Sequence, residues 1–187
     1  MTPAADKPSL RRQFAELRKL ALAACQEALD AAVSSQLGPV ARPEAGIGLY
    51  WPTRSEPRLH RAALELQGQG RWLALPRVEG PHLEYHPWQP GEALSPDDCG
   101  IPAPAAGQPL GPGALAVLLV PALALDQRGI RLGSGGGWYD RLRADPAWRA
   151  IPALAVLPAA CLTGRLPSDP WDVPFDGWLD EHGLHWC

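Results

Sequence analysis

A glycine-rich segment at residues 131–141 carries the residue types most suited to chemistry. It has the sequence RLGSGGGWYDR and follows the apolar run Leu115–Val120, with glycines at positions 133, 135, 136 and 137. Glycine adopts positive φ at little cost, so successive backbone N–H groups of such a loop can turn toward one point. A nest of this kind ahead of a helix binds phosphate or carboxylate oxygens. The spacing therefore predicts an anion-binding loop, and a flexible surface turn is the alternative.

Charged residues border this loop. Arg131 and Arg141 could neutralise a bound anion, and Asp140 stands where an acid could hold a magnesium ion that bridges phosphates. The Gly-Lys-Ser/Thr ending of a P-loop is missing, and so is a dinucleotide-binding GxGxxG with a later acidic residue. The pattern thus indicates a loop that binds a phosphate-bearing ligand but is neither a P-loop nor a dinucleotide-binding loop.

The elements that must position these residues alternate between helix and strand. Helical spacing of apolar residues predicts helices over 9–34, 58–67 and 138–143. Short apolar or alternating runs predict strands over 46–51, 72–75, 82–86, 115–120, 152–157 and 175–179. Gly38 with Pro39 is expected to end the first helix, and Pro76 the second strand. The order predicts an α/β layered domain with a mainly parallel sheet.

Two other segments are expected to lack regular structure. The Pro- and Gly-rich stretch 100–113 predicts a long surface loop. His182 and His185, three residues apart near the end of the chain, more often indicate terminal disorder than a pair of metal ligands. The five histidines show no metal-ligand spacing with each other.

Length and composition limit the function classes. With 187 residues, 46% of them hydrophobic, the chain is expected to form one domain over residues 1–187. A net charge of −3 predicts no nucleic-acid partner. No apolar run has the length of a membrane helix and no secretory signal is visible, so no membrane partner is expected. The four cysteines are far apart, which argues against a zinc site or a disulfide framework and favours the cytoplasm.

The glycine-rich segment resembles the RLGxGxGYYDR signature of the 5-formyltetrahydrofolate cyclo-ligase family. Further segments resemble other motifs of that family in the same order along almost the whole chain. They are KPSLR at 7–11 (KxxLR), Glu56 (the acid of EvdT), LALPRV at 73–78, GIPAP at 100–104 (GIPEP), VPALALD at 120–126 (VPGLAFD) and LPSDPWDVPFD at 166–176 (LPxExHDvpLD). Their ordered co-occurrence favours membership of the family over chance.

The resemblance implies a fold and a reaction. The fold is a three-layer α/β/α domain with a mainly parallel sheet. The reaction converts 5-formyltetrahydrofolate and ATP to 5,10-methenyltetrahydrofolate, ADP and phosphate, with Mg²⁺. Phosphorylation of the formyl oxygen makes a leaving group, and N10 then closes the ring. A monomeric cytoplasmic enzyme that takes the folate, with polyglutamylated forms among its substrates, is expected.

The resemblance also implies roles for particular residues. The catalytic residues are Lys7, Arg131 and Tyr139. ATP is bound by Lys7, Pro8, Ser9, Leu10, Arg11, Arg131, Leu132, Gly133, Ser134, Gly135, Gly136, Gly137, Trp138 and Tyr139. The folate is bound by Glu56, Ser134, Gly135, Gly136, Gly137 and Trp138. The magnesium ligands are Asp140 and Asp172.

Some positions depart from the family pattern. Trp138 replaces the first tyrosine of the signature, so the ring is kept and the hydroxyl is lost. An arginine expected at the position of Leu17 is displaced to Arg18. Two other functions stay open: a non-catalytic folate- or nucleotide-binding member of the same fold, and a phosphotransferase acting on another small molecule. The simplest alternative for Lys7 and Arg11 is a solvated helix face.

Overall fold

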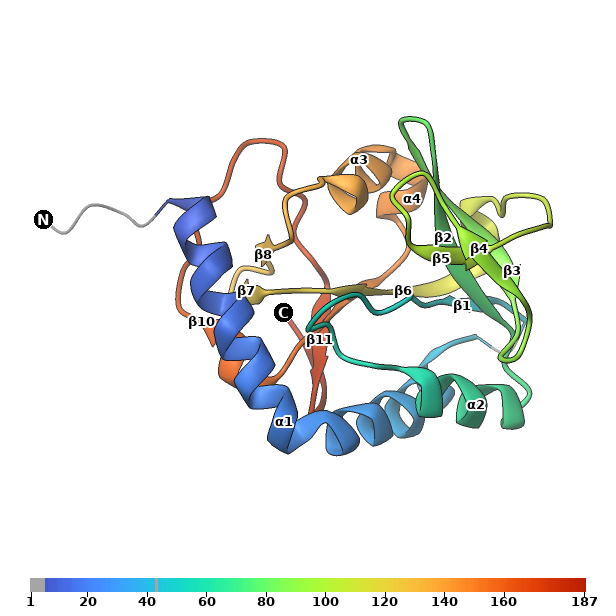
Figure 1. Cartoon of the computed structure of the whole chain (residues 1–187), viewed down its shortest axis with the longest axis horizontal. Helices are drawn as coiled ribbons and strands as arrows, with labels where there is room; N and C mark the ends of the chain where they lie inside the picture. Colours follow the sequence, from blue (N-terminus) through green and yellow to red (C-terminus); the bar gives the residue numbers. More distant parts are fainter. Residues whose placement is uncertain (1–5, 43) are drawn as a thin grey trace, which may run out of the picture.

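A seven-stranded sheet forms the centre of the computed structural model, which describes residues 6–42 and 44–187 (Figure 1). The strand order is β12-β11-β9-β6-β1-β2-β3. The strands are β1 (Gly46–Gly48), β2 (Leu73–Glu79), β3 (His82–Trp88), β6 (Leu115–Pro121), β9 (Ala153–Val156), β11 (Gly177–Asp180) and β12 (Gly183–Trp186). Neighbours from β11 to β2 are parallel, and only the edge strands β3 and β12 are antiparallel to their neighbours. The predicted mainly parallel sheet is confirmed.

Helices cover both faces of this sheet. The helices α1 (Lys7–Val40) and α2 (His60–Gly68) lie on one face, and α3 (Trp138–Ala144) and α4 (Pro146–Arg149) on the other (Figure 1). The three-layer α/β/α arrangement is therefore confirmed. Among the described residues, no helix is long and apolar enough to cross a membrane.

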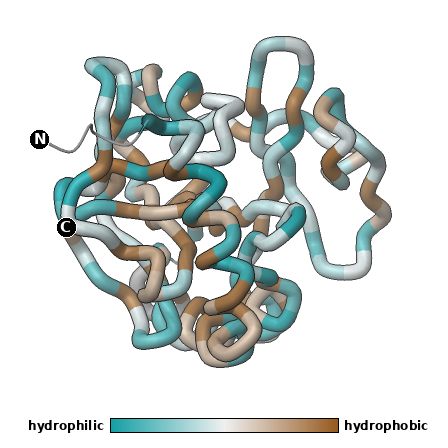
Figure 2. Tube along the Cα trace, turned by 60° about the vertical axis from the view of Figure 1, so that its left-hand side comes forward, coloured by the Kyte–Doolittle hydropathy of each residue, from teal (hydrophilic) through white to brown (hydrophobic). Residues whose placement is uncertain are grey.

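Apolar residues separate into one cluster on each face. Along β6, Leu115, Leu118 and Val120 join the cluster beneath α3 and α4, and Val117 and Leu119 join the cluster beneath α1 and α2. Apolar stretches accordingly run through the interior of the chain trace in Figure 2. A strand covered on both faces needs such a continuous apolar sequence, as predicted for 115–120.

The helix α1 runs further than predicted. It begins after Asp6, whose side chain accepts a hydrogen bond from the amide of Ser9 at 2.9 Å. It continues through Gly38 and Pro39 instead of ending there, so that prediction is wrong. The buried Leu37 packs in the cluster beneath the helix and offsets the poor helix propensity of these two residues.

One strand prediction and the expected terminal disorder also need correction. The strand β2 passes through Pro76 to Glu79 instead of ending at it. Pro76 is tolerated because β1 pairs with β2 only at Leu73 and Ala74, so among the described strands only β3 pairs with β2 at Pro76. The end of the chain is ordered: His185 lies in β12, stacks on Trp178 and contacts Asp180 at 3.2 Å.

The predicted loop 100–113 contains short regular elements. The strand β5 (Pro102–Pro104) pairs with β4 (Leu94–Pro96), and the 3₁₀ turn η1 (Pro112–Ala114) leads into β6. These elements lie beside the β2–β3 hairpin (Figure 1). The prediction of an irregular segment is thus only partly correct.

A small sheet places the glycine-rich segment. It consists of β10 (Leu162–Thr163), β7 (Ala124–Asp126) and β8 (Arg131–Leu132), with the 3₁₀ turn η2 (Ala159–Cys161) before β10. The buried carboxylate of Asp126 accepts hydrogen bonds from the amides of Arg128, Ile130 and Leu166 at 2.9–3.0 Å. These bonds hold the turn between β7 and β8, and β8 then leads directly into the glycine-rich loop.

Candidate active site

A pocket of about 400 Å³ lies where the order of strands reverses. From β1 the chain proceeds to β2 on one side, whereas β6 lies on the other side and is followed by β9 and β11. Residues just beyond β1, including Tyr50 and Glu56, line the pocket together with Pro121 at the end of β6. The carboxyl ends of parallel strands diverge at such a point and leave a crevice suited to ligand binding.

The glycine-rich loop forms one wall of this pocket. Gly135 has φ 108° and Gly137 has φ 66°, both in a region that favours glycine. The carbonyl oxygen of Gly133 accepts a hydrogen bond from Arg11 Nε at 3.0 Å, and that of Gly136 accepts one from Arg141 at 3.0 Å. In the described part of the chain, the amides of residues 134–137 donate to no protein group. They are available to an anionic ligand, as an anion-binding nest requires.

Arg131 is a buried cation at the base of the pocket. Its Nη1 donates to the carbonyl oxygen of Pro121 at 3.0 Å, and Nη2 lies 3.8 Å from the carboxylate of Asp140. Its guanidinium stands over the rings of Tyr139 and Phe175, at 5.5 and 5.3 Å from their centroids. These contacts hold the guanidinium in one orientation, from which it can face a bound phosphate.

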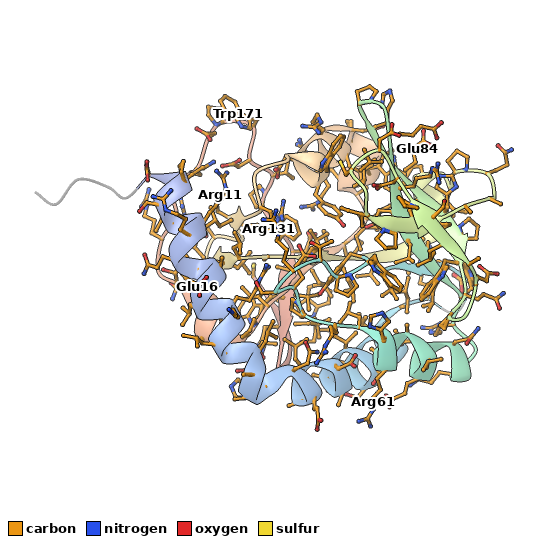
Figure 3. The ribbon with its side chains drawn as sticks, in the orientation of Figure 1. Arg11, Glu16, Arg61, Glu84, Arg131 and Trp171 are labelled. Atoms are coloured by element: carbon orange, nitrogen blue, oxygen red, sulfur yellow. The ribbon has the colours of Figure 1, made fainter. Side chains whose placement is uncertain are left out.

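Lys7 and Arg11 face the pocket from the first turns of α1. The Lys7 ammonium lies 2.6 Å from the carboxylate of Asp169 and 2.9 Å from that of Asp172. Burial lowers the pKa of Lys7, but the hydrogen bonds and charges of the two aspartates outweigh it and leave this pKa raised. In Figure 3, Arg11 and Arg131 lie in the same region between α1 and the segment that leads into α3. The solvated-face alternative for Lys7 and Arg11 is therefore not supported.

Carboxylates line the pocket near these cations. Asp140, Asp169 and Asp172 all contribute to its wall. Among residues 6–42 and 44–187, no group of three or more His, Cys, Asp or Glu side chains is arranged to hold a metal ion. Magnesium in phosphate-transfer sites is commonly held by one or two carboxylates together with substrate phosphates. The oxygen donors present fit that kind of site.

Glu56 lies in a turn beyond β1. Its carboxylate accepts hydrogen bonds from the amide of Thr53 at 2.8 Å and from the Thr53 hydroxyl at 3.0 Å. Burial raises the pKa of Glu56, and the Thr53 hydrogen bonds and the charge of Arg18 lower it in part. The side chain lines the pocket, where its carboxylate can accept hydrogen bonds from a ligand.

Two aromatic residues begin α3 at the edge of the glycine-rich loop. Tyr139 is partly buried and packs against the core, and burial of its hydroxyl together with the charge of Glu56 raises its pKa well above the usual value. The phenol therefore stays protonated and can donate a hydrogen bond. The ring of Trp138 lies against the guanidinium of Arg141, at 4.3 Å from its centroid.

The remaining wall of the pocket is largely apolar. Side chains from four segments form it: Trp51, Pro76, Val78, Leu83 and Ile101. The pocket thus has a charged region at α1 and the glycine-rich loop and an apolar region along β2 and β3. Such a division suits a ligand pair with one highly charged member and one flat, largely apolar member.

Comparison with known proteins identifies the family. A model of the 5-formyltetrahydrofolate cyclo-ligase family matches residues 3–180. The chain belongs to this family. Curated members named 5-formyltetrahydrofolate cyclo-ligase are similar to it: one from Mycolicibacterium smegmatis is 36% identical over 87 residues, covering 46% of this chain and 35% of the relative. Another from Escherichia coli K12 is 37% identical over 60 residues, covering 32% and 33%. The matched segments span about a third of each curated relative.

Solved structures extend the similarity over nearly the whole chain. The 5,10-methenyltetrahydrofolate synthetase of Aquifex aeolicus superposes with a TM-score of 0.77 at 27% identity, covering 96% of this chain and 92% of that one. The synthetase of Mycoplasma pneumoniae has a TM-score of 0.74 at 20% identity, covering 95% and 99%, and supports the fold alone. The cyclo-ligase fold is thus the fold of this chain.

Most residues predicted from the cyclo-ligase motifs meet in the pocket. It is lined by Lys7, Arg11, Glu56, Asp140, Asp172 and residues 131–139. Pro8, Ser9 and Leu10 do not line it: Pro8 and Ser9 are exposed, and Leu10 packs against the core. Their side chains point away because α1 is helical there, so only Lys7 and Arg11, one turn apart, share the pocket face.

Other residues of the pocket were not predicted. Asp169 lies at the acidic position of the motif at 166–176, three residues before Asp172. Its ion pair with Lys7 shows that it belongs to the pocket. Trp171, on the same loop, is 69% exposed and lies at the pocket rim (Figure 3). Trp171 stands where the family motif has histidine, and an isolated tryptophan in a Pro-rich segment has no signal of its own.

Proposed function

We propose that this protein catalyses the ATP- and Mg²⁺-dependent conversion of 5-formyltetrahydrofolate to 5,10-methenyltetrahydrofolate, with release of ADP and phosphate. One observation carries the proposal: a single pocket is lined by the basic residues Lys7, Arg11 and Arg131, the glycine-rich loop, the acids Asp140 and Asp172, and Glu56. Membership of the cyclo-ligase family supports the same reaction.

The charged region suits the triphosphate of ATP. The amides of residues 134–137, which donate to no group in the described part of the chain, offer hydrogen bonds to phosphate oxygens. Arg11 and Arg131 add charge that neutralises the phosphates, and Lys7 would exchange its aspartate partners for them. Phosphoryl transfer depends mainly on such positioning and charge neutralisation.

The proposed reaction has two bond-making steps. The formyl oxygen attacks the γ-phosphorus, and the bond to the ADP oxygen breaks. N10 then attacks the formyl carbon, the carbon–oxygen bond breaks, and phosphate leaves with the former formyl oxygen while N10 loses its proton. Alignment of the formyl oxygen with the γ-phosphorus is the main task of the protein, because neither step needs a covalent bond to a side chain.

The protein groups divide this task between the two substrates. Arg131 lies at the base of the pocket, between the β6 exit and α3, where it can contact the transferred phosphoryl group. Glu56 can accept hydrogen bonds from N–H groups of the pterin, while Trp51 and Val78 cover its flat faces. Asp140 and Asp172 would hold Mg²⁺, which supplies charge neutralisation on the phosphates.

The direct experiment follows the absorbance of methenyltetrahydrofolate. The purified protein is mixed with 5-formyltetrahydrofolate, ATP and Mg²⁺, with a metal chelator in a parallel sample. We expect the absorbance to rise and the chelator to abolish the rise. If the folate binds but no absorbance change occurs at saturating ATP and Mg²⁺, the proposal fails and the non-catalytic folate-binding alternative replaces it.

A further inference from the structure

Arg18 on α1 is a buried cation that does not itself line the pocket. The residue is 3% exposed. Its Nη1 donates to the carbonyl oxygen of Ala122 at 2.9 Å and its Nη2 to the hydroxyl of Ser55 at 3.3 Å. Its Nε has no partner in the part of the chain that the structure describes. Two neutral oxygens do not balance a buried charge, so a nearby anion is required.

Glu56 supplies that negative charge. Burial lowers the pKa of Arg18, and the carboxylate of Glu56 is the strongest of the neighbours that raise it. The effect is mutual: burial raises the pKa of Glu56, and after a Thr53 hydrogen bond the charge of Arg18 does most to lower it. The two side chains are therefore coupled, although they come from elements 38 residues apart in the sequence.

The turn that carries Glu56 also depends on external support. The amide of Glu56 donates to the carbonyl oxygen of Thr53 at 2.9 Å, which closes a tight turn over 53–56. Within this turn Arg54 has φ 49°, and it is the one non-glycine residue with positive φ among those described. Such a conformation persists only where the surrounding structure enforces it. The hydrogen bond from Arg18 to Ser55 links α1 to the middle of this turn.

We propose that Arg18 is a positioning residue for the folate side of the pocket. Through Ser55 and Ala122 it holds the turn that carries Glu56, and its charge keeps Glu56 in the anionic form that accepts hydrogen bonds from the folate. This role rests on the proposed function. Arg18 acts through Glu56, since Arg18 does not line the pocket and Glu56 does.

Other charged or titratable groups also face Glu56. They are Arg131 from β8, Tyr139 from α3 and Tyr50 beyond β1. Burial raises the pKa of both tyrosines well above the usual value, so neither titrates in the acidic range. All three remain unchanged when Arg18 is replaced, and a comparison of variants therefore isolates the effect of Arg18.

The test is the pH profile of kcat/KM for 5-formyltetrahydrofolate between about pH 5 and pH 8, which reports ionisations of the free enzyme. In Arg18→Met we expect the acid limb to move to higher pH by about one unit or more, because an opposite charge beside Glu56 is lost. In a protein that carries Glu56→Gln, replacement of Arg18 by methionine should no longer move the acid limb. Lys19→Met, which removes an exposed charge from the next position of α1, should match the unchanged protein.

Arg18→Lys separates charge from geometry. It retains the positive charge, so the acid limb should stay near its original pH. Lysine lacks the planar guanidinium whose two nitrogens donate separately to Ala122 and Ser55, so the turn should be held less well. The KM for folate should then rise several-fold while the KM for ATP is unchanged. If Arg18→Met folds and its acid limb is unmoved, the proposal is overturned. If Arg18→Met does not fold, Arg18→Lys decides: a raised folate KM supports the proposal and an unchanged one overturns it.

A separate readout keeps the inference distinct from the proposed reaction. If the unchanged protein makes no product, the proposed function fails, and the coupling is then measured by ¹³C NMR titration of the carboxyl groups. The signal of Glu56 is assigned by its absence in Glu56→Gln. A higher titration midpoint of Glu56 in Arg18→Met than in the unchanged protein supports the positioning role, and an equal midpoint overturns it. If Arg18→Met does not fold, the same comparison is made with Ser55→Ala.

Discussion

The ammonium nitrogen of Lys7 lies 2.9 Å from the carboxylate of Asp172. The first residue of α1 is thereby joined to the loop between β10 and β11, 165 positions later in the chain. The family motifs imply that Lys7 binds phosphate and that Asp172 binds magnesium. In this structure the two side chains pair with each other, so the ammonium takes the place of the metal ion and the carboxylate takes the place of the phosphate. A partly exposed ion pair contributes little stability, and its exchange for the charges of a metal–nucleotide complex costs little.

Replacement of Lys7 by methionine should weaken ATP binding selectively. One charge-assisted hydrogen bond is worth about 1.5–3 kcal/mol, which corresponds to a rise of about 10-fold or more in the KM for ATP. The KM for folate should not change. Steady-state kinetics with each substrate varied in turn checks this, with Lys19→Met as the control for loss of an exposed charge. An unaltered KM for ATP would contradict the assignment of Lys7.

Replacement of Asp172 by asparagine should raise the Mg²⁺ concentration that gives half-maximal activity. Changes at groups that merely orient a metal ligand already cost about 10-fold in affinity, so loss of a ligand should cost at least that. The measurement is a Mg²⁺ titration at saturating ATP. Glu16→Gln removes an exposed acid from α1 and serves as the control (Figure 3). An unchanged Mg²⁺ dependence would exclude Asp172 as a ligand.

Replacement of Gly135 by alanine should damage the anion-binding loop. At φ 108° any side chain is strained, and its Cβ would stand 3.6 Å from the guanidinium carbon of Arg11. We expect a loss of about 1–2 kcal/mol in stability and a raised KM for ATP. Gly113→Ala is the matched control, since a Cβ there meets nothing within 4 Å. Equal behaviour of the two variants would argue that the loop is an ordinary surface turn.

Replacement of Asp126 by asparagine should destabilise the whole domain. The carboxylate is 1% exposed and pairs with the guanidinium of Arg128 at 2.7 Å besides binding three amides. Hydrogen bonds to a buried charged group are worth about 1.5–3 kcal/mol each, so the loss of the carboxylate should lower the free energy of unfolding by at least that amount. Urea denaturation measures the change, and Asp98→Asn at an exposed turn should cost much less. Equal losses would show that Asp126 does not hold the β7–β8 turn.

The lowered pKa of Asp126 predicts that the stability of the domain depends on pH. Burial raises the pKa of Asp126, but its hydrogen bonds outweigh burial and lower it below the usual value of about 3.9. The unfolded chain therefore takes up the proton first as the pH falls. The stabilisation by the Asp126 carboxylate should be complete at pH values above the usual pKa of aspartate. It should be lost as the pH falls through the lower pKa that Asp126 has in the folded protein. The free-energy difference between the unchanged protein and Asp126→Asn should shrink with acidification over this range, and a constant difference would contradict the prediction.

Local patterns along the chain were enough to predict much of the fold. The apolar runs at 115–120 and 152–157 predict strands covered on both faces, and β6 and β9 are such strands. The order of elements predicts a mainly parallel α/β sheet, and the motifs predict the family, both of which are confirmed. These features depend on residues close in sequence, which share one helix turn, strand face or loop. The single-domain organisation and the monomeric state stay predictions.

The pairing of distant residues was decided by the tertiary structure. Sequence spacing could not show that Lys7 meets Asp169, or that Pro8, Ser9 and Leu10 lie outside the pocket. Nor could it show that Arg18 is buried beside the turn of Glu56. Such contacts depend on which strands become neighbours and how α1 crosses the sheet. The physical reason is that burial, charge pairing and hydrogen bonding at the site act between segments that only the packed sheet and helices bring together.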